Sequence, residues 1–280
     1  MMNRLMSGDN RISVSPAHPQ GTRIKTVALP VEHGGWGIAL EPVALGLIVA
    51  PTLAGLCLAV ATLGAFLARQ PLKLLAADRR NKRRFPRTKI AQRFALLYGA
   101  VALSGLLVAV IASSDKQFLL PLLMAAPLAM VQLIADAKGK SRALWPELAG
   151  STAMASVAAA LGLAGGWTWL ESLGLWAVLV ARVVPTILYV RARLQRLHGK
   201  EAAATPVIAA HLAALVFILW LVGLKALPAL AAGALIILLL RAFFGFSTGR
   251  PRTAKSIGIS ELCFGALTVL AVTLGHLTNL

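Results

Sequence analysis

The stretch Arg69-Gln-Pro-Leu-Lys73, followed by Asp78-Arg-Arg-Asn-Lys-Arg-Arg84 and by Arg87, Lys89 and Arg93, places ten bases and one acid within twenty-five residues. Long apolar segments without charged residues lie on both sides of it. In bilayer proteins, short loops with this much positive charge stay in the cytoplasm. We therefore predict that the segment 73–93 is a cytoplasmic loop, and the side of every other turn follows by alternation.

The composition is that of a membrane protein rather than a soluble domain. Hydrophobic residues fill 58% of the 280 positions and charged residues only 14%, whereas soluble domains carry roughly a quarter charged residues. The net charge of +18 could indicate a nucleic-acid partner, but the bases lie in short segments between apolar ones. This placement favours attraction to the anionic headgroups of a lipid bilayer and argues against nucleic acid.

Nine apolar segments are long enough to cross a bilayer, which takes roughly 17–25 residues. Their predicted ranges are 32–50, 53–72, 94–112, 118–134, 146–164, 172–190, 206–223, 228–246 and 257–276. The predicted fold class is therefore all-α, a polytopic membrane bundle of nine transmembrane helices within residues 31–280. Residues 1–30 are polar and lack the apolar core of a signal peptide, so we expect a disordered cytoplasmic tail.

The distribution of bases supports this topology. Of the 28 Lys and Arg residues, all but Lys116, Lys225 and Arg182 fall on the predicted cytoplasmic side. The topology places the N-terminus in the cytoplasm and the C-terminus in the periplasm or outside the cell.

Ionisable residues inside predicted spans are candidate functional residues, because each costs several kcal/mol unless it is paired or hydrated. They all fall in the cytoplasmic half of the bundle, which predicts a polar cavity that opens inward. The candidates are Glu41, Arg69, Lys73, Glu147, Arg182 and Glu261.

Arg182 is the most informative of these candidates. It lies roughly 12 Å from the inner end of its helix at Val190, too deep for easy snorkelling. Tyr189 and Arg193 follow at i+7 and i+11 and share its helical face. The alternative to a binding role is a structural ion pair with Glu41 or Glu261. For Arg69 and Lys73, the alternative is snorkelling at the membrane interface.

A glycine-rich run, Glu32-His33-Gly-Gly-Trp36-Gly37, opens the first span. His33 beside Glu32 could shuttle a proton, or the run could form an interfacial entry with Trp36 as its anchor. The two cysteines, Cys57 and Cys263, lie in apolar segments without metal-binding spacing. We therefore predict no metal site, and the sequence assigns no cofactor.

Four blocks resemble the YwiC-like family of bacterial integral membrane proteins. They are Leu29-Pro-Val-Glu-His-Gly-Gly-Trp-Gly-Ile-Ala-Leu-Glu41-Pro42, Phe66-Leu-Ala-Arg-Gln-Pro-Leu-Lys73, Arg182-Val-Val-Pro-Thr-Ile-Leu-Tyr189-Val-Arg191-Ala-Arg193 and Ile257-Gly-Ile-Ser-Glu261. The resemblance implies a multi-pass protein of the bacterial inner membrane, and it implies no particular reaction.

A looser resemblance is to the UbiA-type intramembrane prenyltransferases, which have nine helices and polar motifs at the cytoplasmic ends of helices two and six. The corresponding places here hold bases, among them Arg69, Lys73, Arg182, Arg191 and Arg193. That family binds Mg²⁺ and a diphosphate through Asp-rich motifs, which this chain lacks, so Mg²⁺-dependent prenyl transfer is in doubt. A guanidinium cluster could instead bind a phosphate or carboxylate directly.

The leading functional hypothesis is an inner-membrane protein whose Arg/Glu-lined cavity binds or transforms an isoprenoid or lipid phosphate. Arg69, Lys73, Arg182, Tyr189, Arg191 and Arg193 would bind the substrate. Glu41, Glu261 and His33 would balance charge or act as acid and base. The alternatives are a proton-coupled transporter of a small anion and a non-catalytic assembly partner of a membrane complex, whose protein partner the sequence does not identify.

Overall fold

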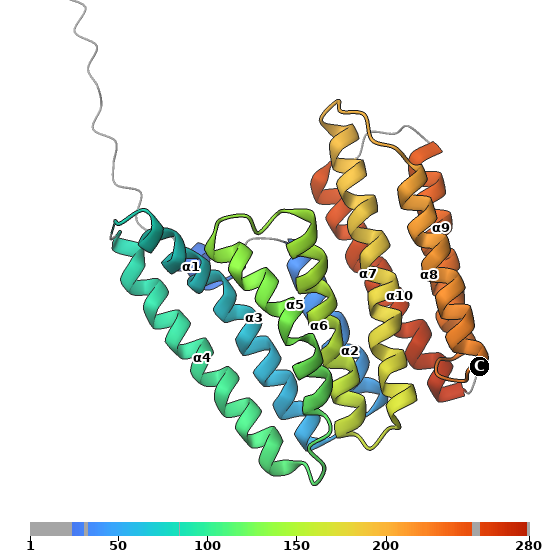
Figure 1. Cartoon of the computed structure of the whole chain (residues 1–280), viewed down its shortest axis with the longest axis horizontal. Helices are drawn as coiled ribbons and strands as arrows, with labels where there is room; N and C mark the ends of the chain where they lie inside the picture. Colours follow the sequence, from blue (N-terminus) through green and yellow to red (C-terminus); the bar gives the residue numbers. More distant parts are fainter. Residues whose placement is uncertain (1–23, 31–32, 84, 248–252, 279–280) are drawn as a thin grey trace, which may run out of the picture.

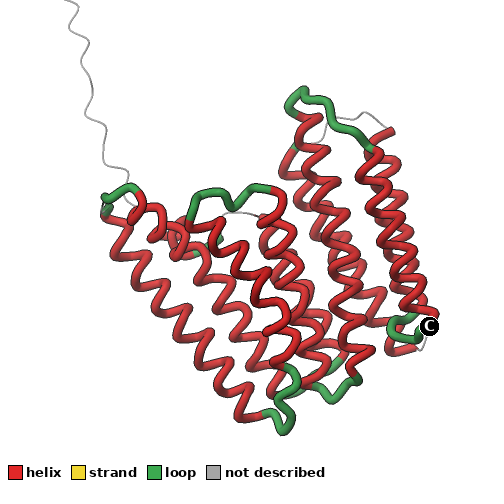
Figure 2. Tube along the Cα trace, viewed as in Figure 1, coloured by secondary structure: helices red, strands yellow, loops and turns green. Residues whose placement is uncertain are grey.

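The computed structural model of the chain describes residues 24–30, 33–83, 85–247 and 253–278, and helices are the only regular elements in these ranges (Figures 1 and 2). The helices are α1 (Ile24–Ala28), α2 (His33–Val49), α3 (Leu53–Arg80), α4 (Pro86–Ala112), α5 (Leu119–Ala137), α6 (Leu144–Ala164), α7 (Trp169–Leu197), α8 (Thr205–Gly223), α9 (Ala229–Ser247) and α10 (Ala254–Thr278). The predicted all-α fold class is confirmed.

Eight of the described helices, α3 to α10, are long and apolar enough to cross a membrane. The protein is therefore a multi-pass membrane protein. The predicted count of nine differs by one helix, because α2 has 17 residues and extends only roughly 25 Å. It occupies the place of the first predicted span and packs against α6, α10, α3 and α7.

The segment predicted as the loop 73–93 is mostly helical, which corrects the prediction. α3 continues to Arg80 and α4 already begins at Pro86. The buried carboxylate of Asp78 holds the turn together, because it accepts hydrogen bonds from Arg87 Nη2 at 2.9 Å and from Thr88 Oγ1 at 2.7 Å. Most of the bases therefore lie on helix ends. At 28 residues, α3 is roughly 42 Å long, well beyond the thickness of a hydrocarbon core.

Part of the segment expected to be a polar tail is also folded. Residues Ile24–Ala28 form α1, whose Val27 and Ala28 are buried. This short helix packs against α3 and α4.

The helices from α2 to α10 run alternately up and down (Figure 1). One end of the bundle carries the α3–α4, α5–α6 and α7–α8 connections, residues 81–85, 138–143 and 198–204. We call this end the basic end. In Figure 1 this end is at the top, and α2 lies behind α6, between the α3–α5 group and the α7–α10 group.

Small residues bring neighbouring helices close together, as is common between membrane helices. A Cβ atom at Gly64 of α3 would lie 2.8 Å from the backbone nitrogen of Ala102 on α4, and one at Gly105 would lie 2.9 Å from that of Ala61. α3 and α4 therefore form a tight pair.

On the other side of the bundle, an apolar core lies between α2, α7 and α9. It contains Leu45, Leu175, Val178 and Leu235.

Candidate functional site

A cavity of ≈ 1380 Å³ lies between α2, α3, α4, α5, α6, α7 and α10. It extends from the α5–α6 connection, at Ser141 and Arg142, to Leu58, Leu106 and Val157 inside the bundle. The charged residues in its lining are Glu41, Arg69, Arg142, Glu147, Arg182, Arg191, Lys255 and Glu261.

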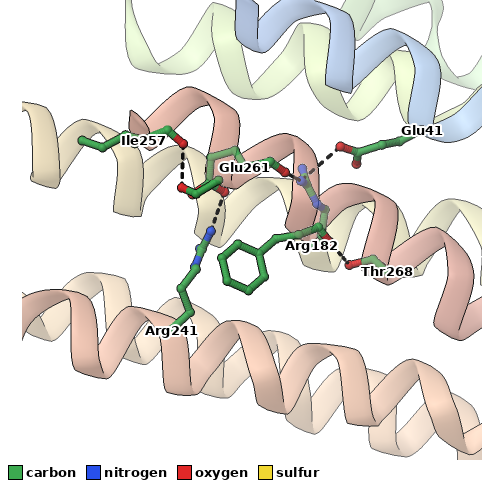
Figure 3. A network of polar contacts seen from close by, with 8 residues as sticks. Glu41, Arg182, Arg241, Ile257, Glu261 and Thr268 are labelled. Atoms are coloured by element: carbon green, nitrogen blue, oxygen red, sulfur yellow. Dashed lines mark hydrogen bonds and ion pairs between the residues drawn. The ribbon is translucent and has the colours of Figure 1, made fainter. Parts of the chain in front are cut away.

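Four charged residues from four helices form a network at this cavity through two ion pairs and one hydrogen bond to the backbone (Figure 3). Arg182 Nη2 on α7 lies 3.0 Å from Glu41 Oε1 on α2, and it donates a hydrogen bond to the backbone carbonyl of Glu261 on α10 at 2.8 Å. The Glu261 carboxylate in turn accepts a hydrogen bond from Arg241 Nη1 on α9. The alternating charges neutralise one another within the apolar bundle.

All four side chains of this network are withdrawn from solvent and lipid. Their exposed fractions are 3% for Arg182, 6% for Arg241, 11% for Glu41 and 12% for Glu261. The alternative that Arg182 forms an ion pair with Glu41 is therefore observed. The same pair lines the cavity, so a structural role does not exclude a binding role.

Glycine at position 265 makes room for the network. A Cβ atom there would lie 2.0 Å from Glu41 Oε1 and 2.8 Å from Arg182 Nη2. Gly265 follows Glu261 by one helical turn, and Thr268 follows by two, so the three share a face of α10. Even alanine at position 265 would displace the Glu41 carboxylate.

Several buried polar atoms of the network have no hydrogen-bond partner among the described residues. They are Arg182 Nε, Arg241 Nε, Arg241 Nη2 and Glu261 Oε1, together with Thr186 Oγ1 one turn after Arg182. A buried polar group without a partner costs roughly 1–3 kcal/mol. Of these residues, Arg182, Thr186 and Glu261 line the cavity, whereas Arg241 does not.

Arg241 is the member of the network that sequence reasoning missed. It was grouped with the cytoplasmic bases, but its guanidinium is buried in α9, 4.3 Å from the ring centroid of Tyr189 and 5.0 Å from that of Phe264. The signal was present, because apolar residues surround Arg241 on both sides in the run Ile236-Ile-Leu-Leu-Leu-Arg-Ala-Phe-Phe244. Arg241 lies within the predicted span 228–246 but close to its inner end, so its charge was counted with the cytoplasmic bases and not among the candidate residues.

Two further ion pairs lie at the edge of the cavity toward the basic end. Arg69 on α3 binds Asp136 on α5 through two hydrogen bonds, of 2.6 Å from Nε and 3.1 Å from Nη2. Gln132 Nε2 donates to the same carboxylate at 2.8 Å. Arg191 Nη1 lies 2.9 Å from Glu147 Oε2. Asp136 was also missed, because hydropathy alone placed it in the connection after its helix.

The predicted site residues Tyr189, Arg193 and Lys73 lie outside the cavity lining. Tyr189 is buried between Arg241 and Phe246, with its ring centroid 5.6 Å from that of Phe246. Arg193 donates a hydrogen bond to the backbone carbonyl of Gly245, and Lys73 is half-buried on α3. His33 begins α2, but its side chain and the whole of Glu32 fall outside the described part of the chain.

The structure thus brings Glu41, Arg182 and Glu261 together and places Arg69 and Arg191 on the same cavity. No group of three or more His, Cys, Asp or Glu side chains that could hold a metal ion occurs within the described residues. The charged groups in the cavity lining are the guanidinium, ammonium and carboxylate groups of Arg, Lys and Glu side chains.

The two contributions of Arg241, charge and planar stacking, can be separated by mutation. We expect Arg241→Met to lower the melting temperature of the detergent-solubilised protein strongly, because removing one partner of a buried ion pair costs roughly 3–5 kcal/mol. Arg241→Lys keeps the charge but loses the planar stacking on Tyr189 and Phe264. Its melting temperature should therefore lie between those of Arg241→Met and the wild type. The double variant Arg241→Met/Glu261→Gln should regain part of the melting temperature lost in Arg241→Met. A melting temperature of Arg241→Met equal to that of the wild type would contradict the buried ion pair.

Comparison with known protein families finds a similarity for the first part of the chain. Residues 29–161, which include α2 to α5 and most of α6, match the family model described as YwiC-like protein. No curated protein and no solved structure matches the chain. The matched segment contains the sequence blocks at Leu29–Pro42 and Phe66–Lys73, and the residues Glu41 and Arg69 of the cavity. The predicted resemblance to the YwiC-like family is confirmed over residues 29–161, which are 133 of the 280 residues, whereas the blocks at Arg182–Arg193 and Ile257–Glu261 lie outside the matched segment.

Proposed function

We propose that the protein binds an anionic amphiphile, an isoprenoid or lipid phosphate, in the cavity between α2, α3, α4, α5, α6, α7 and α10. The observation that carries this proposal is the junction of charged and apolar surface within one cavity. Its lining contains the five bases Arg69, Arg142, Arg182, Arg191 and Lys255 but only three acids, Glu41, Glu147 and Glu261. An excess of positive charge favours an anionic head group.

Arg182 would be the principal ligand of the anion. Its Nη2 is engaged by Glu41 and by the carbonyl of Glu261, whereas its Nε has no partner among the described residues. A hydrogen bond from a guanidinium to a phosphate oxygen contributes roughly 1.5–3 kcal/mol. Arg69, Arg191 and Lys255 would attract the anion from the rim, while Glu41 and Glu261 hold the guanidinium groups in place and balance their charge.

We further propose that the basic end faces the cytoplasm of a bacterial cell and that the protein belongs to the inner membrane. The support is the positive-inside rule, because the connections 81–85, 138–143 and 198–204 and the adjoining helix ends carry most of the bases. The cavity reaches this end at Ser141 and Arg142. An amphiphile of the inner leaflet could therefore present its head group to the rim.

Cysteine labelling tests this orientation. In a variant with Cys57 and Cys263 replaced by alanine, we expect Asp115→Cys to react with a membrane-impermeant maleimide on intact bacterial cells. Lys140→Cys, an exposed position at the basic end, should react only after permeabilisation. The reverse pattern would show that the cavity opens outward.

Binding of farnesyl phosphate to the purified protein tests the proposed function. The variant Glu41→Gln/Arg182→Gln removes the guanidinium without leaving a buried carboxylate unpaired, and we expect at least roughly tenfold weaker binding, the loss of one charge-assisted hydrogen bond. Farnesol, which lacks the phosphate, should bind weakly to both proteins. Isothermal titration in detergent micelles gives the dissociation constants.

A matched control for this experiment is Arg196→Gln. Arg196 lies on the same helix, but its guanidinium donates to the carbonyl of Ala202 outside the cavity lining. This variant should bind farnesyl phosphate like the wild type. Unchanged affinity of Glu41→Gln/Arg182→Gln would refute the anion site. Uptake of inorganic phosphate into proteoliposomes under a pH gradient, without farnesyl phosphate binding, would support the transporter alternative instead.

A further inference from the structure

Two helices that follow one another in the chain do not pack together. α4 and α5 are joined by the short connection 113–118, yet in the described structure α4 packs against α3 and α1, and α5 packs against α6 with a small contact to α3. Figure 1 shows α3 between α4 and α5. One face of α3 is therefore not covered by a helix.

The cavity described above continues into this space. We call this part the α4–α5 groove, and its walls include Ala61 and Ala65 of α3, Gly99 and Leu106 of α4, and Leu122 and Ala129 of α5. The contacts of α5 with the cavity extend from Leu122 to Leu133, roughly 16 Å along its axis. None of the groove residues named here is charged, and small side chains on α3 and α4 leave space between the larger ones.

The groove is open to the lipid side of the bundle. Leu103 and Leu133, which line the cavity, are 59% and 46% exposed. Gly99 is exposed, and a Cβ atom at this position would meet no atom within 4 Å. In a bilayer, exposed apolar surface at this depth lies against hydrocarbon tails. A chain could therefore enter from the membrane, while its head group reaches the charged end of the same cavity.

We propose that the α4–α5 groove binds the hydrocarbon chain of the amphiphile and selects ligands with long chains. This inference rests on the proposed function, because it takes the head group to be an anion held near Arg182. The continuity of one cavity from Arg182 and Glu41 to Gly99 and Leu122 identifies the occupant. A small inorganic anion would use the charged end alone and would leave the groove without a role.

Filling the groove at Gly99 tests the proposal. Gly99→Leu places an isobutyl group in open space of the groove, so it should not disturb the packing of α4 against α3, and leucine favours a helix more than glycine does. We expect it to weaken farnesyl phosphate binding roughly tenfold, the size of an overpacking penalty. Binding of dimethylallyl phosphate, whose chain is too short to fill the groove, should stay unchanged.

The matched control is Gly233→Leu. Gly233 is also a helical glycine whose Cβ would meet no atom within 4 Å, but it lies on α9 outside the cavity lining. It should leave the affinity for farnesyl phosphate unchanged. Equal affinity of Gly99→Leu and the wild type for farnesyl phosphate would overturn the groove while leaving the anion site intact. Failure of the wild type to bind farnesyl phosphate would overturn the anion site and the groove together.

A second measurement uses the unmodified protein and does not depend on the folding of a variant. A farnesyl phosphate analogue with a photoreactive diazirine at the end of its chain is crosslinked to the wild type in lipid nanodiscs, and the modified peptides are mapped. We expect crosslinks to the helices that form the walls of the groove, α3, α4 and α5, and excess farnesyl phosphate should suppress them. Crosslinks confined to other helices would contradict the proposed path of the chain.

Discussion

A guanidinium group inside a membrane bundle needs an anionic partner, and the contacts of Arg182 with α2 and α10 meet this requirement. The carboxylate of Glu41 lies 3.0 Å from Arg182 Nη2, and the carbonyl of Glu261 accepts a hydrogen bond from the same nitrogen. These contacts hold α2, α7 and α10 in one arrangement, and the Glu261–Arg241 pair extends it to α9. Because Gly265 provides the space for the carboxylate, the network depends on a residue without a side chain.

Stability alone does not explain why charged residues occupy this place. Replacing a buried ion pair by apolar residues of similar volume is often neutral or stabilising, because desolvation offsets much of the attraction. The network also contains donors on Arg182 and Arg241 that have no hydrogen-bond partner among the described residues, which weakens the case for a purely structural role. Arg182, Glu41 and Glu261 lie on a large cavity that continues into an apolar groove facing lipid, and we proposed above that this cavity binds the charged and apolar parts of one molecule.

Hydropathy and charge made much of this predictable. The apolar segments indicated the membrane helices, and the isolated charges of Glu41, Arg182 and Glu261 within them indicated the polar site. Helical periodicity placed Arg182 and Tyr189 on one side of α7, and in the structure Arg182 contacts Glu261 while Tyr189 contacts Arg241. It could not tell which neighbour that side would meet, because packing sets the rotation of a helix about its axis. Tyr189 and Arg193 accordingly contact α9 instead of the cavity.

The features that escaped prediction depend on contacts between helices distant in sequence. Asp136 stands at the end of an apolar segment, and only the fold shows that Arg69, 67 positions earlier, binds it. The α4–α5 groove is a stronger case, because consecutive elements are usually neighbours in space and these two do not pack together. The helical ends that replace the predicted loop 73–93 are a local exception, because there Asp78 contacts Arg87 and Thr88 only nine and ten positions later in the chain.

A double-mutant cycle on Glu41 and Arg182 tests the central claim most directly. The free energy of unfolding is measured in mixed micelles for the wild type, Glu41→Gln, Arg182→Gln and the double variant. A buried ion pair predicts a coupling energy of about 1.5 kcal/mol or more. Additivity of the two single losses to within about 0.5 kcal/mol would contradict the account, because the two side chains would then act independently and would not define one site.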